Sequence, residues 1–319
     1  MSWVDMDNGC GMKRLLIACA DPQPWADMFR AELPGFEVLD ALPPIGSLPV
    51  PYLVVGRPPP GLIASVAGLE LVLSLNAGIE HLLTSGEVPP HLPIVRLVDP
   101  GLTRGMAEWV LAQVLSWHRN LPAYAAAQVG RRWQPLAEKL APERRVAVLG
   151  AGALGTPVAE HLARFGFQTR VWSRSGRTVA GAQAFAGPSG LAAAVAGADA
   201  LVNLLPLTAD TEGLLNQALF ERLAPGALVV NAARGGHVVD ADLIAALDSG
   251  QLGWAALDVF RAEPLPPEHP FWRHPKVAVS PHVAAPTHAR TAIAAMAESV
   301  RRHQRGEPVP HIVDRARGY

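Results

Sequence analysis

Cysteine is scarce in this chain of 319 residues, which contains only Cys10 and Cys19. Both lie near the start, so neither a disulfide framework nor a pair of closely spaced thiolates for a metal can be assembled. The histidines show no metal-ligand spacing of the HExxH type either. We therefore expect no metal and a reducing compartment, the cytoplasm.

Net charge and long apolar runs are also lacking. The formal net charge is −1, which gives no electrostatic basis for binding nucleic acid or an anionic membrane surface. No run approaches the roughly 18 uncharged apolar residues of a membrane helix. The apolar LLIACA after Arg14 is shorter than the core of a signal peptide and predicts a buried strand, while residues 1–11 resemble an unstructured extension. A small molecule is the expected partner, with no nucleic acid and no membrane.

Apolar runs of strand length recur twice along the chain. The first series, RLLIACA, PYLVVG, LELVLSL and PIVRLV, ends near residue 100, and the second runs from RVAVLG at Arg145 to KVAVSPH. Helical connectors between such runs are typical of parallel sheets, and a long helix from Thr103 is expected between the two series. The pattern predicts an α/β fold of two flavodoxin/Rossmann-like domains, doubly wound parallel sheets with an interdomain active-site cleft. We expect a discontinuous substrate-binding domain, 1–103 and 286–319, and an NAD(P)-binding Rossmann domain, 104–285, whose sheet has six strands.

A glycine-rich loop follows the first strand of the second series. It reads Gly150, Ala151, Gly152, Ala153, Leu154, Gly155, and it stands between a predicted strand and a predicted helix. Glycines in that setting permit a tight turn and close approach to a pyrophosphate, which the helix N-terminus attracts. The motif is weak by itself, but its context favours a dinucleotide site.

The end of the next strand predicts which coenzyme binds. Enzymes that use NAD place an acid there, on the ribose hydroxyls, whereas this chain has Ser173, Arg174, Ser175, Gly176 and Arg177. No acid repels a 2′-phosphate, and arginine can grip one bidentately. We expect NADPH to be preferred over NADH, although both arginines could instead be solvated surface residues.

Three side chains with complementary chemistry follow predicted strands: Arg234, Glu263 and His282. A carboxylate beside one imidazole nitrogen orients the ring and favours its protonated form, which makes a proton donor. The planar fork of arginine can hold the carboxylate of a 2-keto acid and polarise its carbonyl. Each could singly be a surface or structural residue, but three at strand ends together indicate a catalytic group.

Several ordered motifs agree with one known family. They are NAGIE at residues 76–80, the glycine loop, WSR, NLLPLT, NAARG, LDVFRAEPLP, SPHVAA and the terminal VDRARGY. The chain resembles the D-2-hydroxyacid dehydrogenases from its first strand to its end, and most closely their glyoxylate/hydroxypyruvate reductase A branch.

The resemblance implies residue roles. His282 would be the general acid, Glu263 would orient it, and Arg234 would bind and polarise the substrate. Backbone amides of Ala77 and Gly78 would hold the substrate carboxylate, with Arg57 facing the same cleft. The coenzyme site would include Gly150, Gly152, Ala153, Leu154, Gly155, Ser173, Arg174, Arg177, Leu205, Pro206, Ala232, Ala233 and Asp258, the last near the nicotinamide. A homodimer is expected.

The expected function is NADPH-dependent reduction of glyoxylate to glycolate and of hydroxypyruvate to D-glycerate. A reductase of a bulkier 2-keto acid is an alternative. A different class of protein also uses this fold, namely nucleotide-sensing interaction proteins that resemble corepressors, because a fold does not determine a function.

Overall fold

The computed structural model describes residues 12–44 and 46–318, so Cys10 and the predicted extension 1–11 lie outside the described residues. The described residues divide into two compact units. One comprises those up to Gly101 together with those from Thr287, and the other is Leu102–Pro286. The sequence interpretation drew its boundaries at residues 103 and 286, and each unit is described here by itself.

The first unit is built on a parallel sheet. Its strands are β1 (Lys13–Ala18), β2 (Phe36–Leu39), β3 (Tyr52–Val55), β4 (Leu71–Ser74) and β5 (Ile94–Val95), with α1 (Gln23–Glu32), α2 (Leu62–Ser65) and α3 (Glu80–Thr84) between them. Among the described residues the order is β2-β1-β3-β4-β5, the flavodoxin-like order. Strands β3 and β4 are buried throughout, as expected when helices cover both faces.

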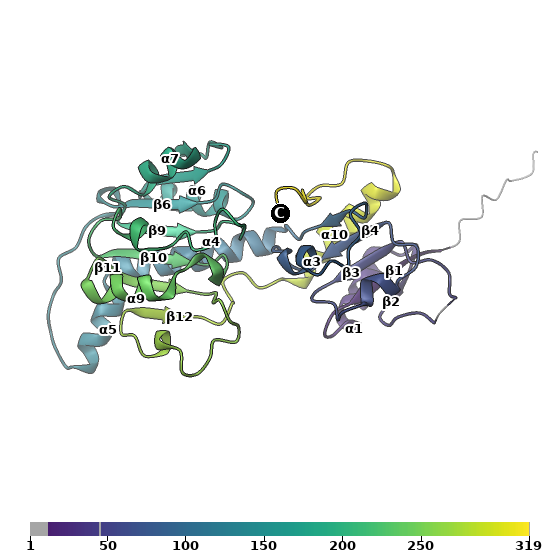
Figure 1. The fold of residues 1–319 in the computed structure, drawn as a ribbon, viewed down its shortest axis with the longest axis horizontal. Helices are drawn as coiled ribbons and strands as arrows, with labels where there is room; N and C mark the ends of the chain where they lie inside the picture. Colours follow the sequence, from purple (N-terminus) through teal and green to yellow (C-terminus); the bar gives the residue numbers. More distant parts are fainter. Residues whose placement is uncertain (1–11, 45, 319) are drawn as a thin grey trace, which may run out of the picture. The chain divides into compact units, whose positions relative to one another are not determined.

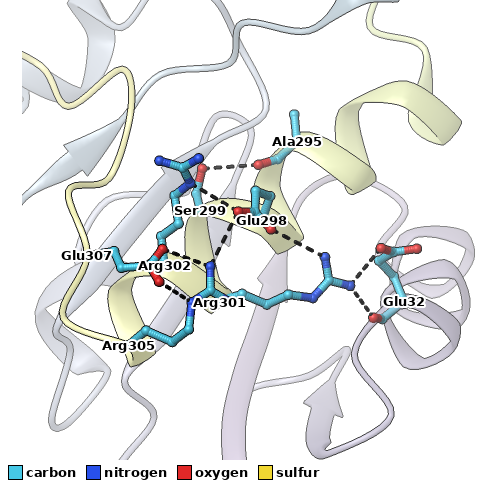
Figure 2. Close-up of polar contacts among 8 residues, drawn as sticks. All are labelled: Glu32, Ala295, Glu298, Ser299, Arg301, Arg302, Arg305 and Glu307. Carbon is cyan, nitrogen blue, oxygen red and sulfur yellow. Dashed lines mark hydrogen bonds and ion pairs between the residues drawn. The ribbon is translucent and has the colours of Figure 1, made fainter.

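Helix α10 (Ala289–Gln304) brings the chain back to the first unit, where it packs beside α1 (Figure 1). Its buried residues Ala292, Ile293, Met296, Ala297 and Val300 recur at helical spacing, which forms one apolar stripe. Arg301 extends this contact by donating to the side chain and the main-chain oxygen of Glu32, both at 2.7 Å (Figure 2). The return of the chain thus rests on an apolar stripe reinforced at its rim by ion pairs.

The long helix expected from Thr103 is two helices. Helix α4 (Pro100–His118) ends before Asn120, whose φ of 58° is left-handed, and α5 (Leu121–Val129) begins after it. The apolar spacing continues across this break, so periodicity alone could not reveal it. Helix α5 has no buried residue. Within the described part of the chain, no helix combines the length and apolar character needed to cross a bilayer.

The second unit contains a larger parallel sheet, teal to green in Figure 1. Its strands are β6 (Arg145–Leu149), β7 (Gln168–Ser173), β8 (Gln183–Ala186), β9 (Ala200–Asn203), β10 (Ala227–Asn231), β11 (Leu252–Leu257) and β12 (Val277–Val279), connected in part by α6 (Gly155–Phe165), α7 (Gly187–Val195), α8 (Gln217–Phe220) and α9 (Asp240–Ser249). The order is β12-β11-β10-β9-β6-β7-β8, a Rossmann order with its switch point between β6 and β9. The predicted fold class of two doubly wound parallel sheets is therefore confirmed.

Two strands were missed by the sequence interpretation. Strand β8 makes the second sheet seven-stranded rather than six-stranded, and β2 adds a strand to the four runs of the first series. Both are four-residue strands at a sheet edge with few buried side chains. An edge strand packs against little apolar surface, so it needs no apolar run that a sequence pattern could show.

Asp199 ties the segment before β6 to the start of β9. Its carboxylate accepts hydrogen bonds from the Arg145 amide at 2.9 Å, from Arg144 at 3.1 Å and from Lys139 at 3.2 Å. Burial alone would raise the pKa of Asp199, but these three donors outweigh it and hold that pKa below its ordinary value of 3.8. The ionised form is therefore the one that stabilises the fold.

Asp199→Asn should lower the free energy of unfolding at pH 7 by about 2 kcal/mol, the usual scale of hydrogen bonds to a buried charge. A depressed folded-state pKa contributes stability above the unfolded pKa and loses it as pH falls through the folded value. The difference from wild type should therefore shrink below about pH 3.8. Urea unfolding over a pH series measures it, and Asp210→Asn, at an exposed position, is the control. An equal loss in both variants would contradict the assignment.

Candidate active site

The glycine loop lies between β6 and α6, as the sequence indicates. Gly150 has a φ of 109°, and an added Cβ there would stand 2.9 Å from the Leu204 oxygen. A Cβ on Gly155 would collide with the Gly150 oxygen, so the loop and the first turn of α6 need glycine to pack. Gly152 is exposed, and a Cβ there would meet nothing within 4 Å. The backbone of the loop at Gly152 is therefore accessible and has no side chain in front of it, as close approach of a pyrophosphate requires.

Ala153 and Leu154 complete this loop. Both are half-buried, and Leu154 is the N-cap residue that directly precedes α6. They lead the chain directly into the helix, whose N-terminal amides and dipole favour a negative group. These two positions therefore shape the loop through their backbone.

The end of β7 carries positive charge and no acid. Arg174 and Arg177 are exposed, and the Arg177 amide donates to Ser173 Oγ at 3.1 Å. The intervening Gly176 has a φ of 65°, so the chain makes a tight turn that keeps both arginines at one strand end. Two exposed arginines therefore follow this strand, and the ribose-binding acid of an NAD site is absent from residues 173–178.

Glu263 and His282 are brought together by the loops after β11 and β12. Glu263 Oε2 lies 2.8 Å from His282 Nδ1, and Oε1 accepts a hydrogen bond from the Phe260 amide at 2.9 Å. The side chain of His282 is 44% exposed and that of Glu263 is 27% exposed. With Nδ1 engaged by the carboxylate, Nε2 is the ring nitrogen available to a substrate.

The charge of Glu263 is maintained by its neighbours. Partial burial alone would raise the pKa of Glu263, but hydrogen bonds from His282 and from the Phe260 amide, with the charges of His282 and Arg234, lower it instead. The carboxylate thus stays ionised at any pH near neutral.

Arg234 follows β10 on the same edge of the sheet. It is half-buried, and its Nη1 donates to the Ala233 oxygen at 2.6 Å. A Cβ on the next residue, Gly235, would collide with the Phe260 carbonyl carbon, so this loop and the one that carries Glu263 are in backbone contact. Arg234 lies close enough for its charge to lower the pKa of Glu263.

Asp258, which the resemblance implies to lie near the nicotinamide, is hydrogen-bonded to the loop after β12. Its oxygens accept hydrogen bonds from Ser280 Oγ at 2.6 Å and from the amides of Val283 and Ala284 at 2.9 and 2.8 Å, and its own exposure is 1%. The main-chain amide of His282 donates to the main-chain oxygen of Asp258 at 2.8 Å. The side-chain bonds engage both carboxylate oxygens, so Asp258 holds the segment that carries His282.

The loops after β9 and β10 contain the remaining predicted coenzyme residues. Leu205, Ala232 and Ala233 are buried, and Pro206 is half-buried. Sequence reasoning missed the polar residues beneath them, Asn203 and Asn231, which end these two strands and have no exposed surface. The sequence signal for each was an asparagine at the last position of an otherwise apolar strand.

Three predicted substrate residues belong to the first unit. Arg57 is exposed just after β3, and Ala77 and Gly78 lie between β4 and α3. The Gly56 oxygen accepts from Asn76 Nδ2 at 3.2 Å and contacts His81 Nε2 at 3.0 Å, which links the loops after β3 and β4. Among the described residues, the amides of Ala77 and Gly78 donate to no acceptor. No group of three or more acidic, histidine or cysteine side chains in the described ranges could hold a metal ion.

Residues 111–284 match the family model described as D-isomer specific 2-hydroxyacid dehydrogenase, NAD binding domain. Over 304 residues the chain is 44% identical to glyoxylate/hydroxypyruvate reductase A of Klebsiella pneumoniae subsp. pneumoniae, and the match covers 94% of this chain and 97% of that protein.

Two solved structures are similar over nearly the whole chain. One is a D-isomer specific 2-hydroxyacid dehydrogenase from Xanthobacter autotrophicus Py2 in complex with NADPH and MES, with a TM-score of 0.91, 39% identity and coverage of 97% of this chain and 100% of that one. The other is an NADPH-dependent glyoxylate/hydroxypyruvate reductase from Sinorhizobium meliloti in complex with NADP and sulfate, with a TM-score of 0.89, 38% identity and coverage of 96% and 100%. On this evidence the chain belongs to the D-isomer specific 2-hydroxyacid dehydrogenase family.

Proposed function

We propose that the protein reduces small 2-keto acids with NADPH, glyoxylate to glycolate and hydroxypyruvate to D-glycerate. The observation that carries this proposal is the Glu263–His282 hydrogen bond of 2.8 Å with Arg234 in electrostatic reach. The names of the similar proteins from Klebsiella and Sinorhizobium support the same substrates and coenzyme.

Each of these residues has a separate role in the proposed reduction. Bound NADPH supplies a hydride to the carbonyl carbon. His282 donates the proton on Nε2 to the carbonyl oxygen, and Glu263 keeps the ring oriented through Nδ1. Arg234 draws electron density towards that oxygen and binds the substrate carboxylate. We assign further carboxylate contacts to the backbone amides of Ala77 and Gly78 and to Arg57. One hydride and one proton convert the keto acid to a hydroxy acid.

The coenzyme residues fit this reaction. The glycine loop would hold the pyrophosphate, and Ser173, Arg174 and Arg177 would bind a 2′-phosphate, which distinguishes NADPH from NADH. Leu205, Pro206, Ala232 and Ala233 would border the coenzyme along the loops after β9 and β10. The cytoplasm is the proposed location, because that compartment holds reduced thiols such as Cys19.

We also propose a homodimer. Residues 121–140, here called the arm, expose Val129 by 88%, Trp133 by 99% and Leu140 by 71%. Helix α5 within the arm has no buried residue although it is mostly apolar. Exposed apolar surface of this kind is typical of an interface. A second copy of this chain is the proposed occupant.

His282→Gln should lower kcat for glyoxylate reduction by about 10² to 10⁴, the usual contribution of general acid catalysis. NADPH affinity should not change, because the glycine loop and the end of β7 are untouched. Steady-state NADPH oxidation and a coenzyme titration measure the two quantities. His161→Gln, at an exposed position on α6, is the matched control. Full activity in the His282 variant would rule out this proton donor.

Arg174→Ala should raise the KM for NADPH about tenfold or more, since it removes a charge-assisted hydrogen bond to a phosphate. The KM for NADH should change little, because NADH lacks the 2′-phosphate. Side-by-side kinetics with the two coenzymes measure this difference. Arg164→Ala removes an exposed arginine of α6 as the control. An equal rise for both coenzymes would contradict phosphate recognition by Arg174.

Trp133→Ser should shift the protein from dimer towards monomer, because it removes a large apolar side chain from the proposed interface. Sedimentation velocity over a concentration series measures the dissociation constant. Trp272→Ser is the matched control, since Trp272 is 50% exposed and lies outside the arm. A wild-type protein that is monomeric at all concentrations would contradict the dimer.

A further inference from the structure

Beneath the proposed coenzyme loops, a chain of buried amide side chains joins β9 to β10. Asn203 Oδ1 accepts from the Leu205 amide at 3.3 Å, and Asn203 Nδ2 donates to Asn231 Oδ1 at 3.1 Å. Asn231 Oδ1 also accepts from the Ala233 amide at 3.3 Å. Both asparagines are fully buried. A buried amide must have its donors and acceptors satisfied, so each loop is held at a fixed place relative to the strand ends.

His237 closes this chain into a ring. Asn231 Nδ2 donates to the Arg234 oxygen at 3.0 Å, and His237 Nδ1 lies 2.9 Å from the same oxygen. On its other side His237 Nε2 lies 3.3 Å from the Pro206 oxygen, and Pro206 follows Leu205, where the chain of contacts began. Both oxygens are acceptors and a neutral imidazole carries one N–H, so the ring donates one hydrogen bond, assigned to the nearer Arg234 oxygen, and packs against the Pro206 oxygen. The His237 ring is itself fully buried. We call this closed set of contacts the Asn–His ring.

The Asn–His ring touches both functional parts of the second unit. At one side it holds residues 205 and 206, which follow Leu204, the residue whose oxygen abuts Gly150 of the glycine loop. At the other side it holds the main-chain oxygen of Arg234. A displacement at one side must stretch or break contacts at the other, because packed and hydrogen-bonded elements shift between discrete arrangements.

We propose that His237 is a positioning residue that couples coenzyme binding to the placement of Arg234, with Asn203 and Asn231 as the other members of the Asn–His ring. This inference rests on the proposed function, because it concerns the same coenzyme and the same arginine. In this proposal His237 contacts neither the coenzyme nor the side chain of Arg234. It acts through the two main-chain oxygens that it bridges.

The two nitrogens of His237 can be replaced one at a time. Asparagine places its amide nitrogen near the position of Nδ1, so His237→Asn keeps the donor to Arg234 and loses the contact with Pro206. Glutamine places its amide nitrogen near Nε2, so His237→Gln keeps the contact with Pro206 and loses that with Arg234. His237→Phe loses both and keeps a ring of similar size.

The expected results differ between these variants. His237→Asn should weaken NADPH binding about fivefold to tenfold, because the loop at Pro206 loses the ring atoms that pack against it, with a smaller loss in kcat. His237→Gln should lower kcat for keto-acid reduction about tenfold and leave NADPH affinity within about twofold of wild type. His237→Phe should show both losses. NADPH affinity is measured by fluorescence titration, and kcat by saturating both substrates.

A purely structural role makes a different prediction. It would lower the melting temperature of all three variants and leave NADPH affinity and kcat per folded molecule unchanged, which would overturn the proposal. So would an Asn variant that lost only kcat or a Gln variant that lost only affinity. His118→Phe is the matched control, because His118 is 4% exposed and its Nδ1 has no hydrogen-bond partner in the structure.

Hydrogen exchange of the wild-type protein tests the coupling without any variant. NADPH should slow exchange of the Leu205 and Ala233 amides together, since both donate into the Asn–His ring. Protection of Leu205 alone would overturn the coupling. If the wild type bound NADPH but reduced no keto acid, the proposed function would fail, whereas the exchange and affinity measurements would still decide the role of His237.

Discussion

The carboxylate of Asp258 is the constraint on which the candidate active site depends. Its three hydrogen bonds to residues 280–284 hold His282 in a left-handed conformation, with a φ of 55°. A residue other than glycine adopts this conformation at an energetic cost, which buried, charge-assisted hydrogen bonds can offset. Together with the main-chain bonds of Ser280 and His282, this anchor keeps the imidazole within 2.8 Å of Glu263.

The sheet explains why residues so far apart in sequence converge. All strands of the second unit run parallel, so their carboxyl ends share one edge, and loops diverge at the switch point between β6 and β9. Gly150, Arg234 and His282 each follow a different strand on that edge. Small residues then let these loops approach, since a Cβ on Gly235 would collide with the loop that carries Glu263. The parallel topology brings these loops to one edge of the sheet, and glycine permits their backbones to come into contact.

Much of this could be predicted from sequence, because apolar runs, glycine spacing and strand-end polar residues are local signals. The Glu263–His282 pair and the glycine loop were predicted on that basis. The edge strands β2 and β8 bury too little surface to leave a pattern. The break at Asn120 lies inside a continuous apolar periodicity, and its local signal was Pro122 in the first turn of α5. The partners of Asp258, which lie on another loop, exist only after folding, so its hydrogen-bonding role could not be read from its position.

The two oxygens of Glu263 have separate partners, and this matters for the orientation of His282. Oε1 is held by the Phe260 amide, a donor that does not titrate, whereas Oε2 faces His282 Nδ1. When Nε2 loses its proton, Nδ1 still carries one and still donates to the carboxylate. Because the Phe260 amide fixes the carboxylate, Nδ1 keeps its proton and its orientation whether or not Nε2 is protonated. The proposed role of His282 requires such a ring, which can exchange a proton at Nε2 while Nδ1 stays hydrogen-bonded to Glu263.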